Sequence, residues 1–143
     1  MHRFTWSLTA DIVLRADHSP LLKGAIMIDI VALGELLIDF TCVNTNADGY
    51  PVMAAHPGGA PANYLATLAK YGEKTALLGK VGSDAFGKLL IGTLRNAGID
   101  TSGLIADEEY FTTMAFVTLD DRGDREFSFA RKPGADTASC FPS

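Results

Sequence analysis

The hydrophobic pattern between residues 28 and 97 alternates between two kinds of element. Near-continuous apolar runs over residues 28–40 and 75–81 predict strands that are buried on both faces. In the first run Gly34 and Glu35 mark either the end of the strand or a close backbone approach. Apolar residues spaced three and four apart over residues 61–71 and 83–97 predict helices, each with one apolar stripe. Strands that alternate with helices in this order predict an α/β fold with a parallel sheet.

The ends of the two helices carry recognisable signals. Pro61 is suited to a first helical position, where its missing N–H is not needed. Ser83 is expected to cap the second helix, because a serine hydroxyl can accept from a free backbone N–H. Gly72 and Gly98 follow the last residues of the two patterns and are expected to end the helices.

A different pattern follows residue 103. Two β-rich runs, residues 114–119 and 125–130, surround a polar turn, which predicts an antiparallel hairpin. Phe127 and Phe129 share one face of it, because side chains alternate along a strand. The sequence leaves two roles open for this hairpin: a cover over the core or a flap over a ligand.

The first 26 residues read differently from the rest. An apolar stretch over residues 4–14 is interrupted by Asp11 and has no clear small-residue cleavage site, which argues against a signal peptide. We therefore expect residues 1–26 to form an extension outside the fold and residues 27–143 to form the domain. An ordered, buried Trp6 would contradict this expectation.

Composition narrows the class of protein. The 143 residues are 48% hydrophobic and 20% charged, typical of one soluble domain with a real core. The formal net charge of −5 argues against general binding to nucleic acids or anionic membranes, and no apolar run reaches the ~18 residues of a spanning helix. Cys42 and Cys140 lie far apart without a C-x-x-C motif, so we expect free thiols and a cytoplasmic protein.

One stretch, residues 56–63, has the composition of a ligand-binding turn. Gly58 and Gly59 let the backbone approach a ligand, and the first free N–H groups of the following helix face the same place. Asn63, one turn into the helix, can both donate and accept hydrogen bonds, as a sugar hydroxyl requires. Asp39 lies near the carboxyl end of the first strand and is either a solvated strand-end residue or an acceptor for ligand hydroxyls.

Three other signals are weaker. His56 beside the glycines is expected to be solvated rather than catalytic. Residues 82–88 fit G-x-x-x-x-G-K, but a phosphate-binding P-loop requires Ser or Thr next, where this chain has Leu89, and bulky Phe86 occupies the loop. A dinucleotide-binding domain would need G-x-G-x-x-G directly after the first strand, which residues 34–36 do not supply.

Four segments, residues 34–40, 58–63, 79–87 and 127–136, occur in an order that resembles the ribokinase/PfkB family of sugar kinases, and fructokinases most of all. The resemblance covers residues 27–136. It implies a ribokinase-like α/β fold, with a mostly parallel sheet flanked by helices on both faces and a small β lid. It also implies ATP-dependent phosphorylation of a sugar hydroxyl, with Mg²⁺ and often a monovalent cation.

The resemblance also assigns roles to residues. Asp39 would bind sugar hydroxyls, and Arg131 matches a position that in related kinases reaches the sugar or its acidic group. The pair Ser83 and Asp84 would be structural, as a helix cap and loop anchor. The substrate-binding residues carried over by motif are Asp39, Gly58, Gly59, Asn63, Phe129 and Arg131.

The departure from the family pattern is as informative as the match. In this family the catalytic aspartate lies in a Gly-Ala-Gly-Asp motif at a helix start in the C-terminal half, where ATP also binds. Residues 134–136 lack the second glycine, so Asp136 is not assigned as the base and no catalytic residue is assigned. The chain therefore resembles the N-terminal half of a kinase. By itself we expect it to be inactive and, with its sheet incomplete, to aggregate or remain partly molten.

Alternatives remain for both activity and partners. The sugar could be ribose or 2-keto-3-deoxygluconate instead of fructose. From a different class, the chain could be a non-catalytic sugar-binding module or a decayed fragment. A small sugar is the expected partner, and the family resemblance also implies a homodimer formed through the lid.

Overall fold

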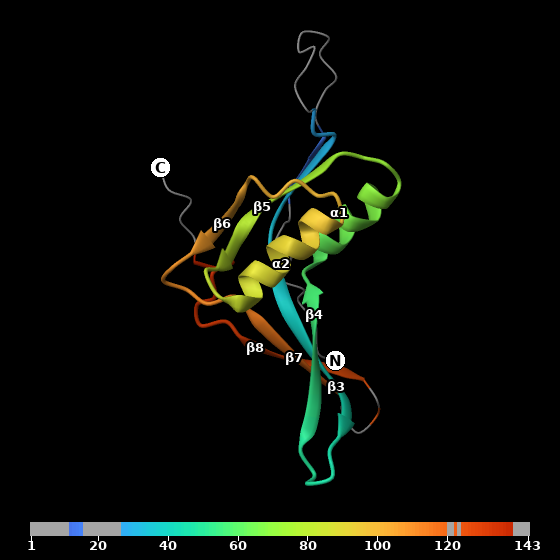
Figure 1. Ribbon diagram of the computed structural model, residues 1–143, viewed down its shortest axis with the longest axis vertical. Helices are drawn as coiled ribbons and strands as arrows, with labels where there is room; N and C mark the ends of the chain where they lie inside the picture. Colours follow the sequence, from blue (N-terminus) through green and yellow to red (C-terminus); the bar gives the residue numbers. More distant parts are fainter. Residues whose placement is uncertain (1–11, 16–26, 120–121, 123, 139–143) are drawn as a thin grey trace, which may run out of the picture.

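The computed structural model describes residues 12–15, 27–119, 122 and 124–138 (Figure 1). Trp6 and Cys140 lie outside the described residues, so the expectations that concern them stay predictions. The elements, in chain order, are β1 Ile12–Arg15, β2 Ile30–Leu33, β3 Leu37–Thr45, β4 Pro51–Gly58, α1 Ala60–Lys70, β5 Thr75–Gly82, α2 Ala85–Asn96, β6 Leu104–Asp107, β7 Met114–Leu119 and β8 Arg125–Ala130.

The first sheet has the strand order β1-β2-β5-β6. Strands β2, β5 and β6 are parallel, as the alternation of strands and helices predicted, and β1 is antiparallel to β2. Strand β1 lies within residues 1–26, which we expected to lie outside the fold. Its four residues are instead paired with β2 in the first sheet. The other residues of that stretch are outside the described part.

Both helices pack on the same face of this sheet (Figure 1). Leu65 of α1 and Leu90 of α2 are fully buried against Leu77 and Val81 of β5, because alternate residues of a buried strand point to the same side. On the opposite face Leu78 is 37% exposed. Within the described residues, therefore, helices cover one face of the sheet and not both.

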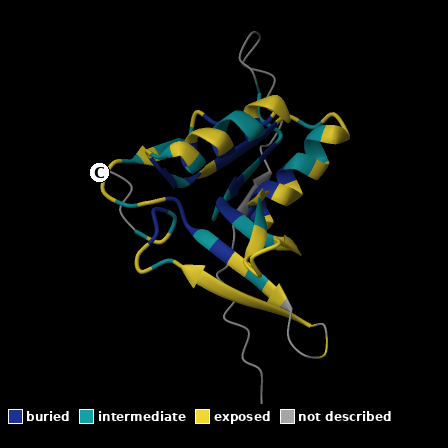
Figure 2. Ribbon diagram, turned by 60° about the horizontal axis from the view of Figure 1, so that its bottom comes forward, coloured by how far each residue is buried: buried dark blue, intermediate teal, exposed yellow. Residues whose placement is uncertain are grey.

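The second sheet has the order β4-β3-β7-β8, and we refer to it as the lid sheet. β3 is parallel to β7 and antiparallel to β4, and β7 forms the expected antiparallel hairpin with β8. Figure 2 shows β8 exposed along its whole length. β7 packs on the core side, where Phe116 stacks on Phe40, whereas β8 does not cover the core, which favours the flap for this outer strand.

The apolar run over residues 28–40 is interrupted at Gly34 and Glu35, where the sequence predicts either the end of the strand or a close backbone approach; β2 does end at Leu33. The chain bends at residues 34–36 and passes from β2 in the first sheet to β3 in the lid sheet. Two glycines make room for this bend: a Cβ on Gly79 would lie 2.6 Å from the carbonyl oxygen of Gly34, and one on Gly59 would lie 2.5 Å from that of Glu35. The two halves of this apolar run therefore belong to two different sheets, which the run itself does not indicate.

The cap of α2 also differs from the expectation. Asp84, and not Ser83, is the N-cap residue, and its Oδ1 accepts from the N–H of Gly87 at 2.8 Å. Gly72 and Gly98 follow the helix ends with φ of 94° and 79°, the left-handed conformation expected of glycines there. In the part of the chain that the structure describes, neither helix is long and apolar enough to cross a membrane.

Candidate functional site

Four residues from four strands form one row across the lid sheet. His56 of β4 lies opposite Asp39 of β3, which lies opposite Ala115 of β7, which in turn lies opposite Phe129 of β8. Residues paired in this way share one face of a sheet. Neighbouring strands are about 4.8 Å apart, so Asp39 and Phe129 are separated by about 10 Å at the backbone. Ala115, which lies between them in the row, is only 1% exposed, so described side chains cover this position and the open space lies beside it.

Asp39 is held at this face by close contact with Gly58. A Cβ added to Gly58 would lie 2.3 Å from Asp39 Oδ2, a distance that no side chain can occupy. Burial raises the pKa of Asp39, and the nearby His56 partly offsets this effect. The carboxylate is thus partly desolvated, which strengthens the hydrogen bonds that it can accept from a ligand.

Substitution of Gly58 by alanine should therefore damage the site. Because the new methyl group would displace the Asp39 carboxylate, we expect the affinity for the sugar that the sequence resemblance implies to fall roughly tenfold or more, equivalent to one lost charged hydrogen bond. Isothermal titration calorimetry with fructose measures this change. Gly92→Ala in α2 is the matched control, because a Cβ there meets nothing within 4 Å. An unchanged affinity of Gly58→Ala would contradict the assignment.

Gly59 joins the lid sheet to α1. It adopts a φ of 114°, which favours glycine, and its Cα lies against the backbone of Glu35. The helix begins at the next residue, with Pro61 in its first turn. Asn63 donates its backbone N–H to the carbonyl oxygen of Gly59 at 3.1 Å and is exposed. Its amide is therefore open to solvent one turn away from the two glycines.

Arg131 lies just beyond the end of β8 and connects three parts of the chain. Its guanidinium carbon is 5.8 Å from the centre of the Phe129 ring, which places it on the face of Asp39. Its Nη2 donates to Glu35 Oε2 at 2.8 Å and also pairs with Asp136. Burial would lower the pKa of Arg131, but Asp136 and Glu35 outweigh this effect and raise it. The guanidinium therefore stays charged.

Asp136 is the most buried member of this group, with a side chain only 1% exposed. It also accepts a hydrogen bond from the hydroxyl of Thr113, itself buried at the start of β7. A Cβ on Gly134 would clash with that hydroxyl. Asp136 therefore fixes Arg131 relative to β7.

A hollow of about 990 Å³ continues along the lid sheet from Asp39. Thr41, Val117 and Phe127 line it together with His56. Phe127 stacks on Phe129 with ring centres 6.3 Å apart and is 51% exposed. The floor of the hollow is thus mostly apolar, with Asp39 and His56 at one end and Arg125 at the other.

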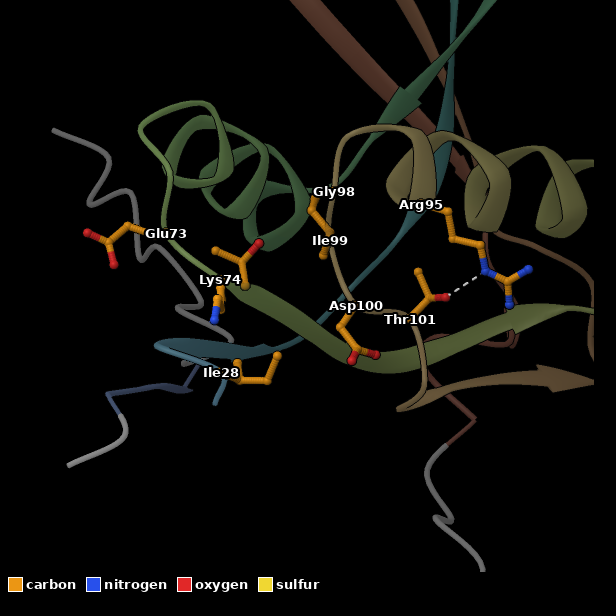
Figure 3. A pocket seen from close by; sticks show the side chains of 9 residues that line it. Ile28, Glu73, Lys74, Arg95, Gly98, Ile99, Asp100 and Thr101 are labelled. Carbon is orange, nitrogen blue, oxygen red and sulfur yellow. Dashed lines mark hydrogen bonds between the residues drawn. The ribbon is translucent and has the colours of Figure 1, made fainter. Parts of the chain in front are cut away.

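A second hollow, of about 440 Å³, lies at the other end of the first sheet (Figure 3). Its lining includes Ile28, Thr75 and Asp100, which precede or begin β2, β5 and β6. Arg95 there donates to Thr101 Oγ1 at 2.9 Å. Ligands of open α/β sheets bind beyond the carboxyl ends of the strands, so this hollow at the amino ends is a weaker candidate.

The P-loop-like segment over residues 82–88 is not a phosphate site. The N–H of Gly82 donates to Thr112 Oγ1 at 3.0 Å, that of Ser83 to the carbonyl oxygen of Asp107 at 2.7 Å, and that of Gly87 to Asp84. A phosphate loop needs these N–H groups free. No group of three or more His, Cys, Asp or Glu side chains able to hold a metal occurs among the described residues.

The structure brings most of the expected residues together. Asp39, Gly58, Phe129 and Arg131 lie on or beside one face of the lid sheet, and Gly59 adjoins it. Asn63 lies on the adjoining helix and is exposed to solvent.

Sequence reasoning missed Glu35 and Thr113, and it gave Asp136 no role. A signal existed for Glu35, which interrupts an apolar run directly after Gly34. The contact between Arg131 and Asp136 joins residues five apart in a loop with no regular period, so the sequence pattern offers no indication of it.

Comparison with known proteins supports a common origin for this arrangement. A family model described as pfkB family carbohydrate kinase matches residues 27–140. A probable fructokinase-3 from Arabidopsis thaliana is 45% identical over 109 residues, which cover 75% of this chain and 32% of that protein. Fructokinase-1 from Oryza sativa subsp. japonica is 43% identical over 109 residues, which cover 75% of this chain and 34% of that protein. The chain thus spans about a third of these relatives' length.

Solved structures show the same similarity in space. The crystal structure of fructokinase from Xylella fastidiosa superposes with a TM-score of 0.71 at 36% identity, over 76% of this chain and 34% of that one. A structure of fructokinase from the same organism with bound ATP gives 0.68 at 36% identity, over 74% and 34%. The first sheet, its helices and the lid sheet therefore form the N-terminal part of a ribokinase-like fold.

Proposed function

Because the chain belongs to the pfkB family of carbohydrate kinases, we propose that it forms the sugar-binding part of a fructokinase-like enzyme. The observation that carries this proposal is the contact between Asp39 and Gly58 on the exposed lid face, beside Phe129 and Arg131. The similarity to fructokinases favours fructose, with ribose and 2-keto-3-deoxygluconate as the alternatives.

The proposed roles follow from the chemistry of each group. Asp39 accepts hydrogen bonds from two sugar hydroxyls, since a carboxylate is an acceptor with two oxygens. The backbone at Gly58 and Gly59 packs against the sugar ring, where no side chain intervenes. Asn63 supplies a donor and an acceptor, and Phe129 supplies an apolar contact on the lid side.

ATP is the phosphoryl donor that the family implies, with Mg²⁺ and often a monovalent cation. The described residues do not fit these groups: the N–H groups of Gly82, Ser83 and Gly87 donate to other groups of the protein, and no cluster of three or more metal-binding side chains is found among the described residues. We therefore assign neither nucleotide nor base to this part. In a complete kinase both would come from elsewhere in the protein.

The experiment is to express the protein from its own gene through the natural stop codon and to assay ATP-dependent phosphorylation of fructose, ribose and 2-keto-3-deoxygluconate. Activity on fructose above the other two supports the proposal, and preference for another sugar replaces fructose with it. Sugar binding without turnover would support the alternative of a non-catalytic sugar-binding module. A folded protein that binds none of the sugars would contradict both.

Two further proposals concern the setting of the protein. We propose a cytoplasmic location, supported by cysteines that form neither a C-x-x-C pair nor a disulfide framework. We also propose that the lid mediates a homodimer, since Phe127 and Phe129 leave about half their surface exposed on β8. Sedimentation velocity tests the dimer, which should dissociate when both phenylalanines are replaced by serine.

A further inference from the structure

The charges around Arg131 suggest which class of sugar the site accepts. Three carboxylates, those of Glu35, Asp39 and Asp136, surround this face, and Arg131 is the cation paired with two of them. The three carboxylates and the Arg131 guanidinium carry a net charge of about −2, and Arg125, the other arginine that lines the hollow, lies four residue pairs farther along β8. An anionic ligand that approached Arg131 would therefore meet net repulsion from these carboxylates.

The guanidinium of Arg131 also donates hydrogen bonds within the protein. An arginine that recognises a ligand carboxylate presents two parallel N–H groups to it. Here Nη2 already donates to both Glu35 and Asp136. The side chain is 25% exposed, so it borders the site, but its charge is compensated within the protein.

We infer that Asp136, by neutralising and positioning Arg131, makes the site select an uncharged polyhydroxyl sugar against a sugar acid. This inference rests on the proposed sugar site and names the residue that sets its specificity. Asp136 touches no sugar in this arrangement, because its side chain is 1% exposed. It acts through Arg131 and is a positioning residue.

Asp136→Asn tests the inference, because asparagine keeps the shape and an acceptor for Thr113 but removes the charge. Affinities for fructose and for 2-keto-3-deoxygluconate are measured by calorimetry on the protein expressed from its own gene. The wild type should prefer fructose, and the ratio should shift toward the acid by roughly tenfold or more in the variant. Asp107→Asn is the control: it removes a carboxylate paired with Lys80 on the other sheet, and the ratio should not change.

A merely structural role for Asp136 would lower both affinities equally, and an unchanged ratio would overturn the inference. If Asp136→Asn fails to fold, Glu35→Gln removes a charge from the same guanidinium at a side chain that is 32% exposed, and the same shift is required there. If the wild type prefers the sugar acid, this inference is wrong, but the proposed function as a sugar kinase still stands. A folded wild type that binds neither sugar removes the proposed function as well.

Discussion

Replacing Asp39 with asparagine should weaken sugar binding about 100-fold and leave the protein at least as stable as the wild type. The loss follows because two charged hydrogen bonds to hydroxyls, each contributing about 1.5 kcal/mol, become weaker or change direction. The stability follows from burial, which raises the pKa of Asp39. A raised pKa means that the charged carboxylate is less stable in the folded protein than in the unfolded chain, so at a pH above 3.8 it lowers the free energy of unfolding. A neutral amide at this position does not have that cost.

Calorimetry with fructose and thermal unfolding followed by circular dichroism measure the two effects together. In the wild type, affinity should fall as the pH is lowered through the raised pKa of Asp39, because protonation removes acceptor capacity. The variant should lack this step. Asp48→Asn, at the exposed turn between β3 and β4, is the control and should behave as the wild type. A variant that loses stability in parallel with affinity would mean that Asp39 is structural.

Replacing Asp84 with alanine should lower the free energy of unfolding by about 3 kcal/mol. Its carboxylate accepts from the N–H of Gly87 at 2.8 Å and from the N–H and hydroxyl of Thr112 at 2.8 and 2.9 Å. Loss of the helix cap costs about 1 kcal/mol, and the donors left unpaired at buried Thr112 cost about 2 more. Chemical denaturation measures the change.

Ser83→Ala provides the matched control for the cap. Ser83 is exposed and its backbone N–H bonds to Asp107, so its substitution should change stability by less than about 0.5 kcal/mol. Although burial opposes it, the hydrogen bonds from Thr112 and Gly87 lower the pKa of Asp84. Its contribution is therefore complete above the ordinary pKa of 3.8 and is lost as the pH falls through the lower, folded value. Equal losses in the two variants would mean that the cap is not Asp84.

The periodic elements of the fold could be predicted from the sequence, because a helix or a strand repeats its pattern over many residues. Helix α1, strand β5 and the β7–β8 hairpin lie within a residue or two of their expected bounds. The end of the first strand at Gly34 and Glu35 has a signal in the sequence, but the passage of the chain into a second sheet could not be predicted, because buried strands of two different sheets share one apolar pattern. It depends on close approach to Gly59 and Gly79, which are distant in the chain.

The site shows the same division. Asp39 and the two glycines were identified from motifs, since the segments that carry them are continuous. The ion pairs of Arg131 depend on a loop and on a bend almost a hundred residues away. Such contacts follow from tertiary packing and have no local signature. The choice between Ser83 and Asp84 as the cap likewise depended on Thr112, from a distant loop.

Strand β3 has a mechanical consequence for the lid. Its first two residues, Leu37 and Ile38, are buried in the core, whereas Val43 near its far end is 59% exposed and the hairpin it forms with β4 projects into solvent (Figure 1). The β3–β4 hairpin is therefore fixed at its buried end and free at its exposed end. Displacement of its backbone should accordingly grow toward the turn at residues 46–49. Asp39 lies next to the fixed end, so the tip can swing while the carboxylate remains in place. Amide hydrogen exchange should accordingly be slow at residues 37–39 and quicken toward the turn.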